Sequence, residues 1–167
     1  GAQDVFSGDN ILSIMQSRRV IAGVLLSVDT FDNKPMTLIE NYIQNEKLEN
    51  KNSKEASNIH FYPGKAKTSF TYAQDSVLYR IFLIFKNSYI IARKPDARLN
   101  IYELMVSSHN EKFSKIFTDR LINQTNLFYT EIRSKKAKET LEILEEAVPN
   151  AKEKLATTIT NRASTQD

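Results

Sequence analysis

Apolar residues recur at the three- and four-residue spacing of a helix face in four parts of this chain. At the head of each part, a Ser or Thr is followed three residues later by Asn, Glu or Gln, an arrangement that caps the free amides of a first helical turn. The pairs are Ser7 with Asn10, Thr37 with Glu40, Thr71 with Gln74, and Ser108 with Glu111. The pattern predicts a helix at each of these points.

The segment after Thr71 has the widest apolar face, so we predict that it lies at the centre of the fold. The predicted core combines this face with the inner positions of the other helices and of two strands. Its members are Ile14, Ile21, Leu25, Ile39, Ile43, Val77, Leu78, Ile81, Phe82, Phe85, Ile101, Met105, Phe113, Phe117 and Leu121.

Two stretches rich in β-branched and aromatic residues predict strands, YIIAR (89–93) and LNIYELMVS (99–107), with KPDA between them as a turn. The polar stretch 45–58 predicts an exposed loop. IHFY (59–62) is either further loop, which we favour, or a short edge strand. We interpret DTFDNKP (29–35) as a break between helices.

The last predicted helix runs from Asn110 to about Thr160. Beyond Arg133 its apolar stripe narrows to a seam whose steps alternate between four and three residues, the spacing of a coiled coil. The seam consists of Ala137, Leu141, Leu144, Val148, Ala151, Leu155 and Thr158. Pro149 lies within it, and an interior proline costs about 3 kcal/mol, so we expect a kink or a stop there.

Together these elements predict an α+β fold in which a small β-sheet is packed by helices. At 167 residues the chain is long enough for one domain with a core of its own. The last helix would measure about 75 Å, more than a domain of this size covers. We therefore predict an α/β base domain over 1–133 and, over 134–167, the start of a rod helix that projects into a coiled coil and is broken at Pro149.

Composition narrows the classes of function. The net charge of +3 arises from 23 basic and 20 acidic residues scattered along the chain, which does not favour nucleic acid as a partner. The absence of cysteine excludes disulfides, thiolate metal sites and a cysteine nucleophile. No apolar run reaches the roughly 18 residues of a membrane span. Because the chain begins with Gly1, we expect a piece of a longer protein whose spans lie elsewhere.

Few residues form a catalytic pattern. His60 and His109 have no partner at a ligand-like spacing, so we predict no metal site, and the isolated glycines predict no cofactor. Glu103 is a candidate general acid if it faces a pocket that raises its pKa. We favour a solvent-facing strand residue instead, and predict that the chain has no catalytic residue and is not an enzyme.

Basic residues give a weak signal for anionic partners. Arg18 and Arg19, with Lys65 and Lys67, could contact anionic lipid headgroups or an acidic glycan, although the pattern favours ordinary solvated surface. The basic residues after Arg133 interleave with glutamates, which is typical of an exposed helix. The candidate oligomer or partner interface consists of Arg18, Arg19, Leu141, Leu144, Val148 and Leu155.

Three stretches, taken in order and spacing, carry a family resemblance: SGDNILSIMQSRRVIAGVLL (7–26), LNIYELMVSSHNEKFSKIFTDRLINQTNLFY (99–129) and KKAKETLEILEE (135–146). They resemble the periplasmic region of bacterial chain length determinant (Wzz) proteins, also called polysaccharide co-polymerases. The first is similar to the helix after the first membrane span, the second to a strand that leads into a long helix, and the third to the helix that leaves the base domain.

The resemblance implies a membrane-proximal base domain in the periplasm, with a membrane span at each end of the full protein. Proteins of this family form rings in the bacterial inner membrane and set the length of O-antigen, capsular or exopolysaccharide chains made by a Wzy-type polymerase. The resemblance therefore implies that this chain is part of a non-enzymatic regulator. The partners of the regulator would be copies of itself, the polymerase and the growing polysaccharide. Some related proteins carry a cytoplasmic tyrosine kinase, on which this sequence is silent.

The chain departs from the family pattern because a returning rod helix and a final strand normally follow, whereas this sequence stops at Asp167. The residues alone leave two other hypotheses open. One is a periplasmic ligand-binding or enzymatic domain with Glu103 in a pocket, and the other is a generic coiled-coil adaptor.

Overall fold

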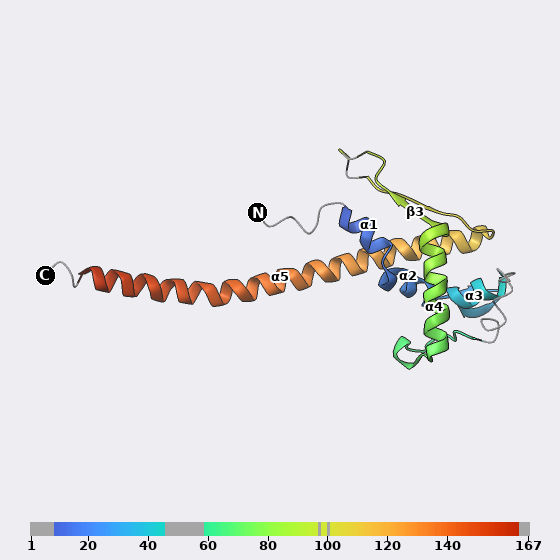
Figure 1. The fold of residues 1–167 in the computed structure, drawn as a ribbon, viewed down its shortest axis with the longest axis horizontal. Helices are drawn as coiled ribbons and strands as arrows, with labels where there is room; N and C mark the ends of the chain where they lie inside the picture. Colours follow the sequence, from blue (N-terminus) through green and yellow to red (C-terminus); the bar gives the residue numbers. More distant parts are fainter. Residues whose placement is uncertain (1–8, 46–58, 97, 100, 164–167) are drawn as a thin grey trace. The chain divides into compact units, whose positions relative to one another are not determined.

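The computed structural model describes residues 9–45, 59–96, 98–99 and 101–163 (Figure 1). The fold is α+β, as predicted, with two small antiparallel sheets and a long C-terminal helix. The elements are α1 (Asp9–Met15), α2 (Arg18–Leu26), β1 (Val28–Phe31), β2 (Lys34–Thr37), α3 (Leu38–Asn45), η2 (Lys67–Ser69), α4 (Tyr72–Ile84), η3 (Phe85–Tyr89), β3 (Ile90–Arg93), β4 (Glu103–Val106) and α5 (Glu111–Ala163).

The chain forms two compact units, residues 1–128 and residues 129–167. The first contains every element that precedes α5 together with the first turns of α5, and the second consists of the later turns of α5. The division that the sequence predicted, between residues 133 and 134, stays a prediction. Two other expectations, the cap at Ser7 and the loop over 46–58, lie outside the described residues.

Side-chain caps set the starts of the helices. The backbone amide of Gln74 donates to Thr71 Oγ1 (3.2 Å), and the side-chain Oε1 of Gln74 accepts from the backbone amide of Thr71 (3.0 Å). The predicted capping box at α4 is therefore confirmed. At α5 the prediction was wrong by two residues. Asn110, not Ser108, caps this helix, because Asn110 Oδ1 accepts a hydrogen bond from the Phe113 amide at 3.0 Å.

The segment that we interpreted as a break is a β-hairpin. Strand β1 pairs antiparallel with β2, and the two residues between them, Asp32 and Asn33, have φ values of 48° and 60°. Positive φ at both positions is what a two-residue type I′ turn requires. Pro35 is tolerated in β2 because a two-stranded sheet has edges where no amide is needed. Polar residues and Pro35 interrupt these two strands, so their sequence does not show the β-branched and aromatic runs of the other sheet.

The second sheet agrees with the two predicted strands, since β3 pairs antiparallel with β4. Alternation along β4 places Leu104 and Val106 against the core and leaves Met105 facing away. Met105 is 44% exposed and Ile101, which precedes the strand, is 58% exposed, so their assignment to the core was wrong. IHFY forms no strand, in agreement with the interpretation that we favoured.

Aromatic rings from three elements, α3, η3 and α5, form the centre of the core. The ring of Phe85 lies 5.0 Å from that of Tyr42, 4.7 Å from that of Tyr89 and 4.8 Å from that of Phe117, measured between centroids. The rest of the predicted core is buried, except that Ile14 and Ile43 are only partly buried. Buried apolar positions outside the predicted core list are Met15, Val20, Ala22, Val24, Phe31, Leu38, Tyr42, Phe61 and Ile90.

A π-helical turn, η3, joins α4 to β3. Its hydrogen bond runs from the Ile90 amide to the Phe85 carbonyl, five residues earlier. π-turns are rare. Because such a turn adds a residue to the helical repeat, it changes the direction in which the following side chains point. Here the turn stacks Tyr89 on Phe85, with 19° between the ring planes, before the chain leaves as a strand.

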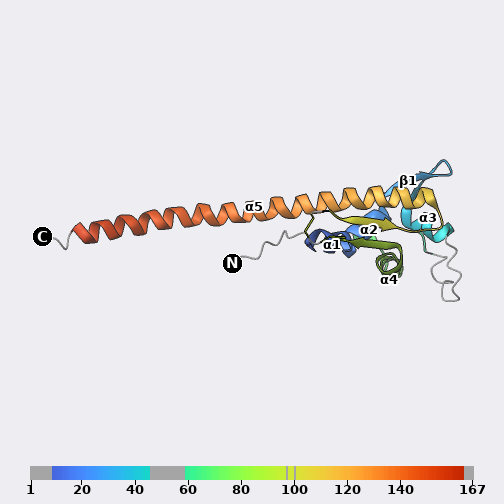
Figure 2. The same ribbon diagram turned by 90° about the horizontal axis from the view of Figure 1, so that it is seen from above.

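The first turns of α5 hold the β1–β2 hairpin in place. Lys112 Nζ donates to the Thr30 carbonyl at 3.2 Å, and Arg120 Nη2 lies 3.2 Å from Asp29 Oδ2. Helix α4 runs across these turns in Figure 1 and is seen end-on in Figure 2. Phe113, buried on the inner side of α5, packs with α4 in the same core cluster.

Helix α5 does not stop at Pro149 but continues to Ala163, so the expected stop was wrong, whereas the alternative of a kink stays a prediction. Pro149 is exposed, so water can hydrate the carbonyl that loses its helical partner. The residues on both sides, Glu146–Ala147 and Ala151–Lys152, are strong helix formers and offset the rest of the cost. Whether the seam forms a coiled coil stays a prediction.

Replacing Phe85 with Ala tests the aromatic centre. We expect the free energy of unfolding to fall by about 3–5 kcal/mol, because the fully buried ring leaves a cavity among three other rings. Urea denaturation followed by circular dichroism measures the change. The matched control is Tyr72→Ala, whose ring is 91% exposed; it should change stability by less than about 0.5 kcal/mol. Equal losses in the two variants would contradict the assignment of Phe85 to the core.

Candidate functional site

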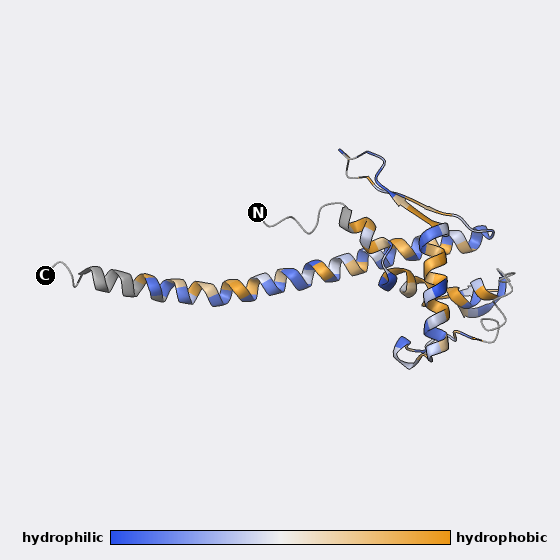
Figure 3. Ribbon diagram, in the orientation of Figure 1, coloured by the Kyte–Doolittle hydropathy of each residue, from blue (hydrophilic) through white to orange (hydrophobic). Residues whose placement is uncertain are grey.

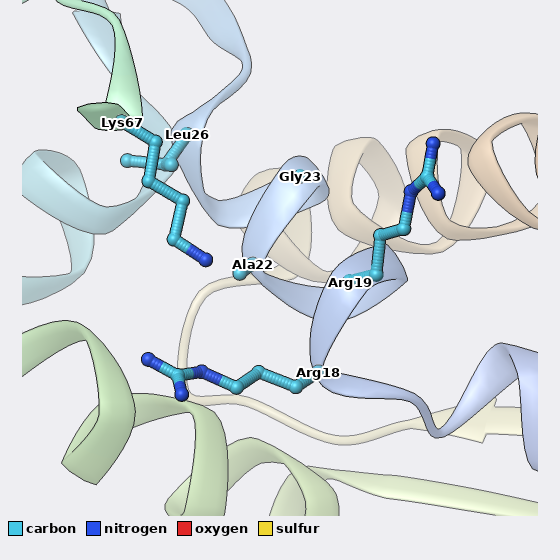
Figure 4. A pocket seen from close by; sticks show the side chains of 6 residues that line it. All are labelled: Arg18, Arg19, Ala22, Gly23, Leu26 and Lys67. Carbon is cyan, nitrogen blue, oxygen red and sulfur yellow. The ribbon is translucent and has the colours of Figure 1, made fainter. Parts of the chain in front are cut away.

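A shallow depression of about 440 Å³ lies beside α2 and brings together two of the residues predicted as an interface (Figure 4). Its lining residues are Arg18, Arg19, Ala22, Gly23, Leu26 and Lys67. Three of them are cationic and the other three are small or aliphatic. Lys65, which the sequence grouped with them, does not line the depression; its Nζ donates to Gln74 Oε1 at 3.1 Å.

Local sequence explains why two arginines point away from the core here. Ser17 caps α2, since its Oγ accepts from the Val20 amide at 3.3 Å, so the helix begins at Arg18. The buried face of α2 then consists mainly of aliphatic residues. Arg19, Gly23 and Leu26, at positions i, i+4 and i+7, share the other side, which borders the depression.

Aromatic rings hold both guanidinium groups. Arg18 Cζ lies 5.0 Å from the centroid of the Tyr79 ring, and Arg19 Cζ lies 4.4 Å from that of Phe128. Cation–π contacts of this kind are worth about 0.5–1 kcal/mol at exposed sites. Figure 4 shows Arg18 and Lys67 extending into the same space in front of Ala22, while Arg19 points the other way. The guanidinium of Arg18 is therefore oriented before any ligand binds.

The electrostatics of this depression are one-sided. Among the described residues that line it, none is acidic, and α2 has no acidic residue in its first turn. Cations at the N-terminus of a helix are disfavoured because the helix dipole is positive there. Placing Arg18 and Arg19 at that end leaves a positive potential that an anion would relieve.

Gly23 forms part of the floor of the depression although it lies inside a helix. A Cβ built on Gly23 would meet only the side chain of Gln124, at 3.8 Å, which is ordinary van der Waals contact. Packing therefore does not demand glycine here, and a glycine inside a helix costs about 1 kcal/mol relative to alanine.

The other four predicted interface residues lie in the second unit, on α5. Leu141, Leu144, Val148 and Leu155 are 55%, 54%, 49% and 62% exposed. Orange apolar positions alternate with blue polar ones along this part of α5 in Figure 3. Helices that expose a heptad seam of this kind associate through it in coiled coils. The Lys135–Glu139 ion pair (3.9 Å, i,i+4) beside the seam is the solvated pairing that the charge pattern predicted.

Sequence reasoning missed a buried polar cluster centred on Glu40. Its Oε2 accepts from the Phe61 amide (2.8 Å), and its Oε1 lies 2.9 Å from His60 Nδ1 and 3.0 Å from Gln44 Nε2. Burial disfavours the charged carboxylate, but the hydrogen bonds from His60, Phe61 and Gln44 outweigh it, so the pKa of Glu40 lies below its usual value. The only signal in the sequence was the predicted capping pair of Thr37 and Glu40. Of its two hydrogen bonds, the one to the Thr37 side chain forms: the backbone amide of Glu40 donates to Thr37 Oγ1 at 3.2 Å.

Glu103 is paired with Arg93 at the surface of the protein. Its Oε2 accepts from Arg93 Nε at 2.7 Å across the β3–β4 sheet, and its side chain is 40% exposed. This hydrogen bond lowers the pKa of Glu103, whereas a general acid needs a raised pKa. His60 is hydrogen-bonded to Glu40 through its Nδ1 atom. In the described part of the chain, no group of three residues is arranged to hold a metal ion.

The comparisons with known proteins find no relative. No family model matches the chain, and neither a curated protein nor a solved structure matches it. Within the described residues, no helix has both the length and the apolar character needed to cross a membrane. The family resemblance of the three stretches therefore stays a prediction, and the site is judged on its own geometry.

Two glycine-to-alanine variants should have opposite effects. We expect Gly23→Ala to raise the free energy of unfolding by about 0.5–1 kcal/mol, because it removes a flexible residue from a helix without a clash. Gly64→Ala should lower it by about 1 kcal/mol, since Gly64 has φ +79° in open space and only the backbone resists the side chain. Thermal unfolding of both variants measures the changes. Destabilisation by Gly23→Ala would show that packing requires this glycine.

The buried carboxylate predicts a pH dependence of stability. Because the folded-state pKa of Glu40 is below the usual 4.5, its contribution is present above about pH 4.5 and is lost as the pH falls through the folded value. Urea denaturation at several pH values should therefore show a smaller loss on acidification for Glu40→Gln than for the unmodified chain. At neutral pH the same variant should lose about 1–3 kcal/mol, since an amide nitrogen cannot accept from the donors that face it.

Glu145→Gln is the control for this experiment, because Glu145 is exposed on α5. Its stability should follow that of the unmodified chain at every pH. If Glu40→Gln and the unmodified chain lose the same free energy between neutral pH and about pH 3, ionised Glu40 is not a source of stability.

Proposed function

We propose that this chain is the periplasmic part of a non-enzymatic regulator of polysaccharide chain length, similar to the Wzz proteins. In this proposal it works as an oligomeric scaffold at the bacterial inner membrane, together with a Wzy-type polymerase. The membrane segments of the full protein would flank the chain on both sides. The polysaccharide would be O-antigen, capsule or exopolysaccharide.

The observation that carries the proposal is the exposed heptad seam on α5, which directly follows a packed α+β unit. Leu141, Leu144 and Val148 are each about half exposed, so a large apolar stripe has no cover among the described residues. Such a stripe needs a second helix. The resemblance supplies two: the returning helix of a longer chain and the rods of neighbouring subunits.

Partners other than helices follow from the same proposal. The polymerase and the growing glycan would meet the assembled ring rather than a catalytic centre. This fits the surroundings of Glu103, the candidate general acid, whose ion pair with Arg93 lowers its pKa. A generic coiled-coil adaptor would use the seam equally well, and a ligand-binding domain is favoured by the depression at Arg18.

Deleting the gene separates these functions. A chain-length regulator predicts that the modal length of surface polysaccharide, read from a gel profile, collapses to a broad distribution. The profile should be restored by the full-length protein supplied on a plasmid. An unchanged modal length in the deletion strain would defeat the proposal and leave the adaptor or the ligand-binding domain.

A single substitution tests the seam within this function. Leu144→Asp in the full-length membrane protein should weaken self-association by about tenfold or more, because a carboxylate replaces an apolar contact between helices. Chemical crosslinking in membranes measures the assembly, and the gel profile measures its consequence.

Ile143→Asp is the matched control, since Ile143 is 66% exposed on the same turn but lies off the seam. It introduces the same charge on the same helix and should leave both readouts unchanged. For the isolated chain of 167 residues we predict only weak self-association. A ring that is stable at micromolar concentration without the membrane segments would contradict that prediction.

A further inference from the structure

We infer that the depression beside α2 binds the phosphate group of an amphiphilic molecule, held between Arg18 and Lys67 with its apolar part on Ala22, Gly23 and Leu26. This assignment rests on the geometry of the first unit. It stands whether or not the chain regulates polysaccharide length.

Two cations are available at this place. Arg18 begins α2 and Lys67 belongs to η2, far away in the sequence, yet both line the depression and extend into the same space (Figure 4). Neither has an ion-pair partner among the described residues. Two adjacent cations without counter-charge repel each other, and an anion placed between them removes this repulsion.

The chemistry of the two groups favours phosphate. A guanidinium presents parallel N–H donors that match two oxygens of a phosphate, and an ammonium adds a compact point charge. The face of Arg18 is covered by the Tyr79 ring at 5.0 Å, which leaves the N–H edge available. A phosphate monoester carries nearly two charges at neutral pH, enough for both cations, whereas a carboxylate carries one.

The rest of the lining selects against a neutral sugar. Within the described residues that line the depression, no carboxylate or amide side chain is present to accept hydrogen bonds from hydroxyl groups. Ala22, Gly23 and Leu26 instead offer an apolar floor. A volume of about 440 Å³ has room for a phosphate together with part of a hydrocarbon or glycerol group. The ligand class is therefore a phosphate-bearing amphiphile.

Binding to vesicles tests the inference. The full 167-residue chain is mixed with vesicles of phosphatidylcholine that contain phosphatidic acid, a phosphate monoester, or with vesicles of phosphatidylcholine alone, and bound protein is measured by co-sedimentation. In a second arm, inorganic pyrophosphate is titrated by calorimetry against sodium chloride of equal ionic strength. Binding in the vesicle arm alone identifies a membrane lipid, and binding in the pyrophosphate arm identifies a site that also accepts soluble phosphates.

The double variant Arg18→Gln with Lys67→Gln should weaken binding by about tenfold or more, since it removes two charge-assisted contacts. The matched control is Lys86→Gln with Lys115→Gln, which removes the same two charges from exposed positions of the same unit. The control should weaken binding by less than about twofold. Equal weakening in both double variants, or no binding in either arm, would overturn the inference.

A measurement on the unmodified chain guards against a variant that fails to fold. Acetylation of lysines by an amine-reactive ester is followed by mass spectrometry with and without pyrophosphate or the anionic vesicles. Occupation of the depression should cause a loss of reactivity at Lys67 relative to Lys86. Equal reactivity of the two lysines under conditions where binding is measured would place the ligand elsewhere and overturn the assignment.

Discussion

The hydrogen bonds of the buried Glu40 carboxylate hold the segment 59–62 against the core of the first unit. The segment 59–62 has no sheet partner, yet Phe61 within it is fully buried, so its backbone polar groups must be satisfied by side chains. Glu40 accepts the Phe61 amide, Thr37 Oγ1 donates to the Phe61 carbonyl at 2.8 Å, and Gln74 Nε2 donates to the His60 carbonyl at 2.8 Å. Side chains from β2, α3 and α4 thereby replace a missing strand.

This cluster also shows where sequence reasoning reaches its limit. The helices and their apolar faces follow from periodicity, and the strands β3 and β4 follow from their β-branched and aromatic residues. The hydrogen bonds of the Glu40 side chain do not follow from periodicity. Its place in a capping pair predicts a contact three residues away, whereas its carboxylate accepts from the Phe61 amide, more than twenty residues away. The β1–β2 hairpin was missed for another reason: Asp29 and Pro35 interrupt its strands, so the Asp32–Asn33 turn is the main signal in the sequence.

The two candidate surfaces differ in how well they can be predicted from the sequence. The heptad seam of α5 is local, and its spacing alone places Leu141 and Leu144 on one stripe. The depression is not local. Arg18 and Arg19 are adjacent in the sequence yet point in different directions, and Lys67 joins Arg18 only through the packing of the first unit. The sequence identified these cations as candidates, but only the tertiary structure shows which of them extend into the same space.

The π-turn η3 makes chain length, more than side-chain identity, the constrained quantity between α4 and β3. Its middle residues Lys86, Asn87 and Ser88 are exposed and make few demands on their side chains. Removing one residue would restore α-helical hydrogen bonding but rotate all that follows by about 100°. Ile91 would then turn toward the aromatic centre and Ile90 toward water, which inverts the β3–β4 ribbon. In evolutionary terms, substitutions should accumulate freely at these three middle positions, whereas insertions and deletions in the turn should be purged.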